Sequence, residues 1–119
     1  MTRDVRLKRA DVAAFGRPSK RFHGALFSLS VAPLPPVRQW AYACIVSKRV
    51  AGKATHRNRI KRRCREAARR SLKEFPPQKP AALVFRAKEA AGEATFADID
   101  ADVRALVDKI ARTGYNLSQ

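Results

Sequence analysis

The feature that most restricts the possible folds of this chain is a strongly basic segment whose apolar residues recur at helical spacing. Between Arg57 and Arg70 there are eight arginines or lysines and one acidic residue. The apolar residues follow one another at steps of four, three, one, four and three positions, which predicts one helix over about Thr55–Phe75 with a single apolar stripe. The stripe consists of Ile60, Cys64, Ala67, Ala68, Leu72 and Phe75. Such a helix has to pack this stripe against a sheet or another helix.

The cations of this predicted helix gather on the side away from the stripe. At about 100° per residue, the opposite half holds Asn58, Arg59, Arg62, Arg69, Arg70 and Lys73, with Arg63 and Arg65 at its edges. Arg57 and Lys61 fall in the sector of the stripe, so we expect the helix to begin beyond the edge of the sheet. Within the basic run, Glu66 offers the local compensation, four residues from both Arg62 and Arg70. Like charges at this spacing destabilise an isolated helix, whereas a bound phosphate backbone neutralises them.

The rest of the sequence predicts two more helices and three strands, in the order α-β-β-α-β-α. We expect the helices at Arg9–Gly16 and Phe96–Arg112, and the strands at Arg21–Val31, Gln39–Val46 and Ala81–Ala87. The apolar run of the second strand is typical of a central strand that is buried on both faces. We therefore expect a single domain, residues 1–119, of the α+β class.

Residues that break or begin regular structure separate these elements. Three prolines in Ala32–Val37 predict a loop. Ser47–Val50 is compatible with a loop or with a further short strand. Thr95 is expected to cap the last helix, with Asp98 three residues further on and Gly114 just beyond its end.

The net charge is far from zero, and its sign changes along the chain. The formal net charge is +16 and the pI is about 11.3. Residues 1–88 hold 23 basic and 4 acidic side chains, a net charge of +19, whereas residues 89–119 carry a net charge of −3. The positive part predicts a polyanionic partner, with nucleic acid first and an anionic membrane surface second. We expect no membrane-spanning segment and no secretory signal, and hence a cytoplasmic protein.

The cysteines and histidines do not form the spacing of a metal or disulfide framework. Cys44 and Cys64 lack C-x-x-C spacing, and we expect both to be small buried residues. His23 and His56 have no orienting carboxylate near them in the sequence. The acids within Phe96–Asp102 are expected to cap the helix and face solvent. We therefore expect no catalytic side chain in this protein.

The loop before the long helix extends the predicted cationic surface. Gly52 and Lys53 precede the helix N-terminus, where free backbone N–H groups favour an anion, and Lys48 and Arg49 lie just upstream. Arginine outnumbers lysine on the helix, which suits bidentate contacts with phosphates.

The segment "VSKRVAGKATHRNRIKRRCRE" (Val46–Glu66) resembles the signature of the bacterial ribonuclease P protein subunit. "RLKRADV" near the start and the closing helix extend the resemblance over most of the chain. The signature positions are filled here by Ser47, Lys48, Arg49, Gly52, Arg57, Asn58, Arg59, Lys61, Arg62, Arg65 and Glu66.

The resemblance implies a fold, a function and partners. The fold is an α-β-β-α-β-α sandwich with a left-handed crossover around the long helix, similar to the second domain of ribosomal protein S5. The function is that of the protein component of ribonuclease P, an endoribonuclease ribonucleoprotein that removes the 5′ leader of precursor tRNA. The RNA subunit performs the hydrolysis with Mg²⁺ that is bound mainly by RNA. The implied partners are the ribonuclease P RNA and the precursor tRNA leader, with no DNA and no membrane.

The resemblance also implies two sets of contact residues. The leader cleft is expected to include Phe15, Arg21 and Phe27, although the family pattern has an aromatic residue where Val12 stands, and Phe15 is one position off the second aromatic. Strand alternation places Phe27 on one exposed face with Arg21 and His23, and a core position is the alternative for this phenylalanine. The expected contacts to the catalytic RNA are Lys48, Arg49, Lys53, Arg57, Asn58, Arg59, Lys61, Arg62, Arg65 and Arg69.

Two other classes of protein would share the basic helix. A ribosomal protein or a general RNA chaperone would have the charge but no need for the full motif from Ser47 to Glu66. A protein that reads the major groove of DNA needs varied side chains for base edges, and nearly uniform arginine argues against it.

Overall fold

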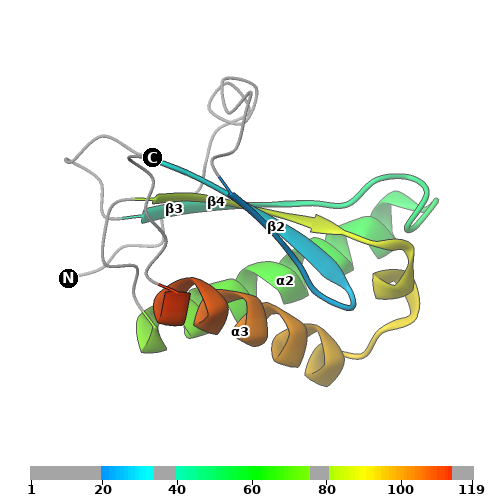
Figure 1. Cartoon of the computed structure of the whole chain (residues 1–119). Helices are drawn as coiled ribbons and strands as arrows, with labels where there is room; N and C mark the ends of the chain where they lie inside the picture. Colours follow the sequence, from blue (N-terminus) through cyan, green and yellow to red (C-terminus); the bar gives the residue numbers. More distant parts are fainter. Residues whose placement is uncertain (1–19, 34–39, 76–80, 114–119) are drawn as a thin grey trace.

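The computed structural model describes residues 20–33, 40–75 and 81–113 (Figure 1). The predicted helix Arg9–Gly16 lies outside these ranges. The elements, in chain order, are the strands β1 (Lys20–His23), β2 (Phe27–Pro33) and β3 (Trp40–Ile45), helix α2 (Ala54–Glu74), strand β4 (Ala81–Ala87), the 3₁₀-helix η1 (Glu89–Glu93) and helix α3 (Phe96–Thr113). The predicted strand Ala81–Ala87 is confirmed, and both long helices agree with their predicted ranges to within one residue at each end.

The four strands form one mixed sheet in the order β1-β2-β4-β3. The β1–β2 and β2–β4 pairs are antiparallel, whereas β3 pairs with β4 in parallel. A parallel pair needs a crossover connection, and α2 supplies it. The prediction that the second expected strand is central is wrong, because β3 is an edge strand of the described sheet and β4 lies between β2 and β3.

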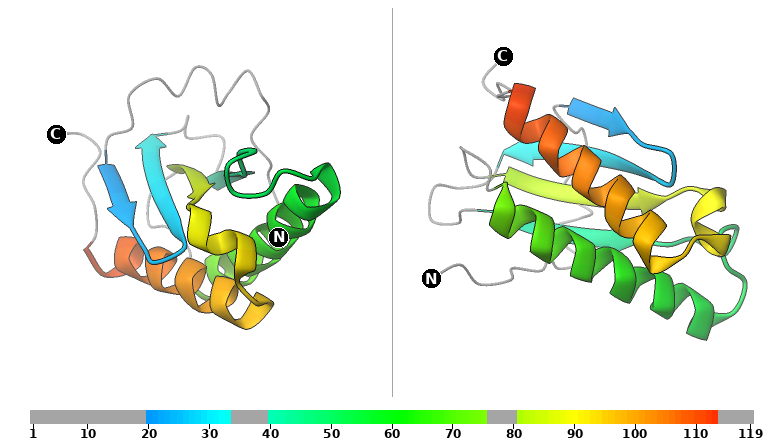
Figure 2. Two further views of the ribbon diagram at one scale, coloured as in Figure 1. Left: turned by 90° about the vertical axis from the view of Figure 1, so that its right-hand side faces the viewer. Right: turned by 90° about the horizontal axis from the view of Figure 1, so that it is seen from below.

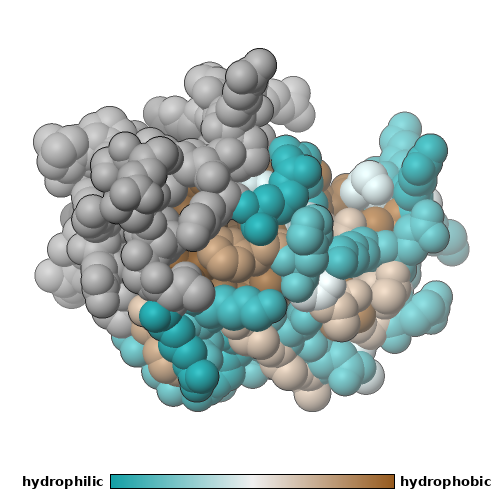
Figure 3. Space-filling model, viewed as in Figure 1, coloured by the Kyte–Doolittle hydropathy of each residue, from teal (hydrophilic) through white to brown (hydrophobic). Residues whose placement is uncertain are grey.

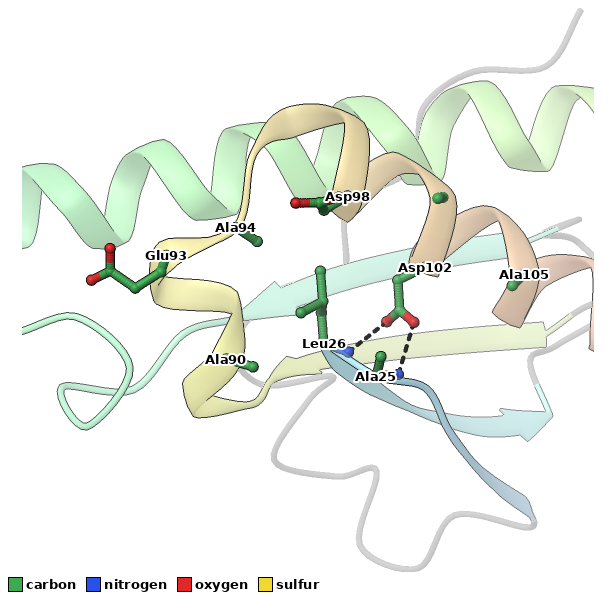
Figure 4. Close-up of a pocket in the computed structure, with 9 residues that line it drawn as sticks. Ala25, Leu26, Ala90, Glu93, Ala94, Asp98, Asp102 and Ala105 are labelled. Carbon is green, nitrogen blue, oxygen red and sulfur yellow. Dashed lines mark hydrogen bonds between the residues drawn. The ribbon is translucent and has the colours of Figure 1, made fainter.

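The predicted single strand Arg21–Val31 is also wrong, because the chain turns back at Gly24 and forms the β1–β2 hairpin. Asp102 of α3 holds this turn from a distance of more than seventy residues in the chain. Its carboxylate accepts hydrogen bonds from the backbone N–H groups of Ala25 (2.8 Å), Leu26 (3.1 Å) and Phe27 (2.9 Å), the first two of which are drawn in Figure 4. A Cβ atom at Gly24 would lie 2.6 Å from this carboxylate, so any larger residue would displace the Asp102 side chain from the turn.

Both long helices cover the same face of the sheet and lie side by side (Figure 2). The hydrophobic core fills the space between them and the sheet. The predicted stripe of α2 is confirmed, with Phe75 partly buried and with Ser71 as an additional buried member that the apolar pattern did not include. The largest buried side chains of the core include Phe27, Leu29, Ile60, Leu72, Leu83, Phe85, Ile99 and Leu106.

The start of α3 shows the predicted cap. The hydroxyl oxygen of Thr95 accepts a hydrogen bond from the Asp98 N–H (3.2 Å), and the Asp98 carboxylate accepts one from the Thr95 N–H (3.3 Å). This reciprocal pair satisfies two N–H groups that a helix N-terminus leaves without partners.

None of the helices described here is long and apolar enough to cross a lipid bilayer.

Candidate nucleic-acid interface

The exposed side of α2 and the loop before it form one cationic surface. The exposed cations are Lys48, Arg49, Lys53, Arg59, Arg62, Arg70 and Lys73, and Asn58 is exposed among them. We call these eight residues the basic surface. Hydrophilic side chains gather at the end of the molecule where this loop meets α2, on the right in Figure 3. Arg57, Lys61, Arg65 and Arg69, which were also predicted to contact RNA, are partly buried.

The loop between β3 and α2 is a turn rather than a further strand. The Ser47 carbonyl accepts hydrogen bonds from the N–H groups of Val50 (3.1 Å) and Ala51 (3.3 Å). The Arg57 guanidinium donates to the carbonyl oxygens of Ala51 (3.1 Å) and Gly52 (2.7 Å). Arg57 therefore fixes the loop from the first turn of the helix, a contact that its position in the apolar sector makes possible.

The 3₁₀-helix η1 packs against this loop. A Cβ atom at Gly92 would lie only 2.6 Å from the Val50 carbonyl oxygen, so the backbone of η1 closely approaches the backbone of the loop. Ala51 and Ala91 are both buried in the core beside this contact. Sequence reasoning missed η1, and the glycine in "KEAAGEA" was the available signal for a close backbone approach.

No described side chain caps the N-terminus of α2, which is the positive end of the helix dipole. Lys53 is the N-cap residue and makes no side-chain capping hydrogen bond, and no acidic residue stands in the first turn. The positive end of the helix dipole therefore adds to the field of Lys53 and of Lys48 and Arg49 upstream.

The one carboxylate in the basic run pairs differently from the prediction. Glu66 accepts hydrogen bonds from Arg69, at 2.6 Å and 3.3 Å, instead of compensating Arg62 and Arg70 equally. This hydrogen bonding lowers the pKa of Glu66, and the charges of Arg69, Arg70 and Lys73 lower it further. The Glu66 carboxylate is thus directed to one partly buried arginine, while no hydrogen bond or ion pair joins Arg59, Arg62 or Arg70 to another residue in the described ranges.

The face of the sheet away from the helices carries a second, smaller group of polar side chains. Arg21 and His23 are exposed as predicted, and His23 stands opposite Ser28, which in turn pairs with Arg86. Residues paired in register share a face of the sheet, so Arg86 joins Arg21 and His23 on this side. Alternation along "AALVFRA" is the signal that would have identified Arg86.

The expected exposure of Phe27 is wrong. Its exposed fraction is 0%, and it packs in the main core under the helices. The hairpin turn explains the error, because the alternation from Arg21 does not continue through Gly24–Leu26. Phe15, the other aromatic residue predicted for the leader cleft, lies outside the described residues.

A hollow between η1, α3 and the β1–β2 turn is lined mainly by alanines and Leu26, and its charged side chains are all acidic: Glu93, Asp98 and Asp102 (Figure 4). Carboxylates repel phosphates, so this region does not extend the basic surface. Across the three described ranges, no group of three or more His, Cys, Asp or Glu side chains is placed to hold a metal ion.

Comparisons with known proteins agree with these features. The family described as Ribonuclease P matches residues 1–111. The ribonuclease P protein component of Bordetella petrii is 37% identical over 110 residues, covering 88% of this chain and 87% of that protein. The fold is similar to that of the ribonuclease P protein from Staphylococcus aureus, with a TM-score of 0.70 and 22% identity over 95% of this chain and 100% of that one.

The ribonuclease P protein from Thermotoga maritima is a second structural relative, with a TM-score of 0.69 and 22% identity over 93% of this chain and 97% of that one. The match to the family covers nearly the whole chain, and it includes the loop and helix that form the basic surface. The chain therefore belongs to the ribonuclease P protein family, the protein component of an endoribonuclease ribonucleoprotein that works with its RNA subunit in tRNA 5′ processing.

Proposed function

We propose that the basic surface binds the catalytic RNA of ribonuclease P. The observation that carries this proposal is the excess of exposed cations on α2: Arg59, Arg62 and Arg70 make no hydrogen bond or ion pair among the described residues, and a phosphate backbone supplies a partner. Lys48, Arg49 and Lys53 extend the same field to the helix N-terminus. Lys61, Arg65 and Arg69, which are partly buried, complete the proposed set of contacts on α2.

Arg57 has a separate part in this proposal. Its guanidinium holds the Ala51 and Gly52 carbonyls, so it sets the position of Lys53 relative to α2. The remaining N–H groups of the guanidinium are available to a phosphate oxygen. Arg57 therefore acts on RNA both directly and through the loop, and Asn58 beside it supplies a donor and an acceptor.

The precursor tRNA leader is the second ligand in the proposal. Arg21 and Arg86 face away from the helices and provide cations for a single strand on that side of the sheet, which His23 shares. Phe15 remains the proposed stacking residue. Phe27 is not part of this proposal, because its ring is buried in the core on the helix side of the sheet.

Magnesium enters the reaction through the RNA in this proposal. Among the described residues no group of three or more His, Cys, Asp or Glu side chains is placed to hold a metal ion, and the proposal has Mg²⁺ bound mainly by the RNA. The cations of the protein instead neutralise phosphates that would otherwise repel one another. The holoenzyme therefore needs less Mg²⁺ than the RNA alone, and it acts in the cytoplasm, where its precursor tRNA is found.

The test is cleavage of a precursor tRNA by a bacterial ribonuclease P RNA at limiting Mg²⁺, with and without the protein. The proposal predicts that the protein restores cleavage at the mature 5′ end. It also predicts that precursor with a leader binds the holoenzyme more tightly than mature tRNA does. Tight RNA binding without restored cleavage would contradict the proposal and favour a general RNA chaperone.

A further inference from the structure

Two sulfur atoms face each other beneath the basic surface, where β3 meets α2. The Sγ atoms of Cys44 in β3 and Cys64 in α2 are 2.8 Å apart, and both cysteines are free. The two residues are twenty positions apart in the chain, so the contact is made by the fold and not by local sequence. A disulfide has an S–S length of about 2.05 Å, so a small movement brings the two sulfur atoms into bonding range.

We propose that Cys44 and Cys64 are an oxidation site, at which hydrogen peroxide converts the two thiols into an intramolecular disulfide that ties α2 to the sheet. A dithiol reductant reverses the reaction. Disulfides in proteins of a reducing compartment are usually transient or redox-sensing, and a pair that is held in contact by the fold suits that behaviour.

The reaction is balanced by one peroxide for each pair of thiols. The Cys44 thiolate attacks one peroxide oxygen, the O–O bond breaks, and the leaving hydroxide takes up a proton to give water and a Cys44 sulfenic acid. The Cys64 sulfur then attacks the Cys44 sulfur and loses its proton, while the S–O bond breaks and a second water leaves. Two electrons pass from the two thiols to the peroxide.

The different surroundings of the two cysteines set the order of these steps. Cys44 is partly exposed, whereas the exposed fraction of Cys64 is 0%. Burial raises the pKa of the Cys64 thiol, and its hydrogen bond with Cys44 raises it further. Peroxide therefore reaches the partly exposed Cys44 first, and the Cys64 sulfur, 2.8 Å away, then attacks the sulfenic acid from inside the core.

The cross-link encloses the part of the chain that carries the interface. The turn at Ser47–Ala51 and the first turns of α2 lie between the two cysteines. A disulfide that closes this segment lowers the conformational entropy of the unfolded chain. The folded state changes little because the thiols are already in contact. We therefore expect oxidation to stabilise the protein while the basic surface keeps its RNA affinity.

The experiment uses the full chain, fully reduced and then freed of reductant, and treated with hydrogen peroxide. The expected results are the loss of both free thiols, a mass decrease of about 2 Da, and a higher thermal midpoint by about 4 °C or more. Dithiothreitol should restore the starting values. Affinity for ribonuclease P RNA should stay within about twofold of the reduced protein, equivalent to less than half a kcal/mol.

Two variants assign the roles of the cysteines. Cys64→Ala should stop at a Cys44 sulfenic acid that dimedone traps, and Cys44→Ala should keep its buried thiol under the same treatment. Three outcomes for the unsubstituted protein would overturn the proposal. The first is that the folded protein keeps both thiols under conditions that oxidise the urea-unfolded chain. The second is a mass gain of about 16 or 32 Da. The third is the formation of covalent dimers in place of the internal bond.

Discussion

Helices α2 and α3 lie side by side on one face of the sheet, yet their charged residues are used in opposite ways. On α3, Asp102 holds the β1–β2 turn, Asp98 caps the helix, and Arg104 pairs with Glu74 of α2 at 2.6 Å. On the outward side of α2, Arg59 and Arg62 have no such partner among the described residues. Asp98 and Asp102 of α3 thus have hydrogen-bond partners within the fold, whereas Arg59 and Arg62 of α2 have none among the described residues.

This difference separates stability from binding. Substitutions on the α3 side should destabilise the protein and leave the salt dependence of RNA binding unchanged. Substitutions in the basic surface should leave the stability nearly unchanged and should weaken the salt dependence of RNA binding. The predictions below test this separation in order of decreasing expected effect.

The largest effect is expected for Asp102→Ala. The substitution leaves the N–H groups of Ala25, Leu26 and Phe27 without their acceptor, and partly buried donors without partners are costly. We expect the free energy of unfolding to fall by about 2–4 kcal/mol, measured by urea denaturation. Asp98→Ala is the matched control on the same helix and should cost about 1 kcal/mol. Equal costs for the two variants would mean that the carboxylate of Asp102 does not hold the hairpin.

A smaller effect on stability and a clear effect on binding are expected for Gly92→Ala. Its new Cβ would lie 2.6 Å from the Val50 carbonyl oxygen, so the loop that carries Lys48 and Arg49 has to move. We expect a stability loss of about 1–3 kcal/mol and weaker binding to ribonuclease P RNA, measured by titration.

Gly52→Ala is the control for this prediction. Gly52 lies in the same loop, is exposed, and has no heavy atom within 4 Å of an added Cβ, so both quantities should stay near those of the unsubstituted protein. If Gly92→Ala binds RNA with unchanged affinity, η1 does not position the loop.

Arg57 and Arg59 provide a comparison within the first turns of α2. Arg57→Ala removes two hydrogen bonds to loop carbonyls and should lower the free energy of unfolding by about 1 kcal/mol. Arg59→Ala should change stability by less than about 0.5 kcal/mol. Both should weaken RNA binding. If calorimetry gave the same unfolding temperature for both variants, the loop would not depend on Arg57.

The smallest effect concerns Glu66. Arg69 lowers the pKa of Glu66 in the folded protein. The stabilisation of the folded state by this pair is therefore present above the unfolded pKa of about 4.3. It is lost as the pH falls through the folded pKa. The pair is substantially exposed, so solvent screening limits its contribution to about 0.5 kcal/mol or less.

The measurement is the difference in unfolding free energy between the unsubstituted protein and Glu66→Gln, at pH 7 and at pH 3. The difference should be small at pH 7 and should shrink at pH 3, because the contribution is lost as the pH falls through the lowered folded pKa of Glu66. Glu89→Gln, an exposed control, should show no difference at either pH. A difference that grows as the pH falls would have the wrong sign for this pair.

Much of the α2–α3 layer was predictable because its signals are local. The 3.6-residue period of the apolar stripe defined α2, and Thr95 with Asp98 defined the start of α3. The resemblance to the ribonuclease P protein signature was also recognisable, because its residues lie within one segment from Ser47 to Glu66. Local patterns carry this information because helices form from neighbours in the sequence.

The features that the sequence analysis did not predict depend on contacts between segments that are distant in the chain. The hairpin exists because Asp102 binds the turn at Gly24 from another helix, and nothing near Gly24 in the sequence reveals that partner. The error at Phe27 followed directly from the missed turn. The edge position of β3 and the approach of Gly92 to Val50 are likewise set by packing and not by spacing.

The most direct test of the central claim compares two charge-matched double variants by the salt dependence of their binding to ribonuclease P RNA. Arg59→Ala with Arg62→Ala, and Arg104→Ala with Arg112→Ala, each remove two cations. For the first pair we predict a log–log slope shallower by roughly two units or less, and for the second pair no change. Equal slopes for the two variants would contradict the assignment of RNA binding to the outward face of α2.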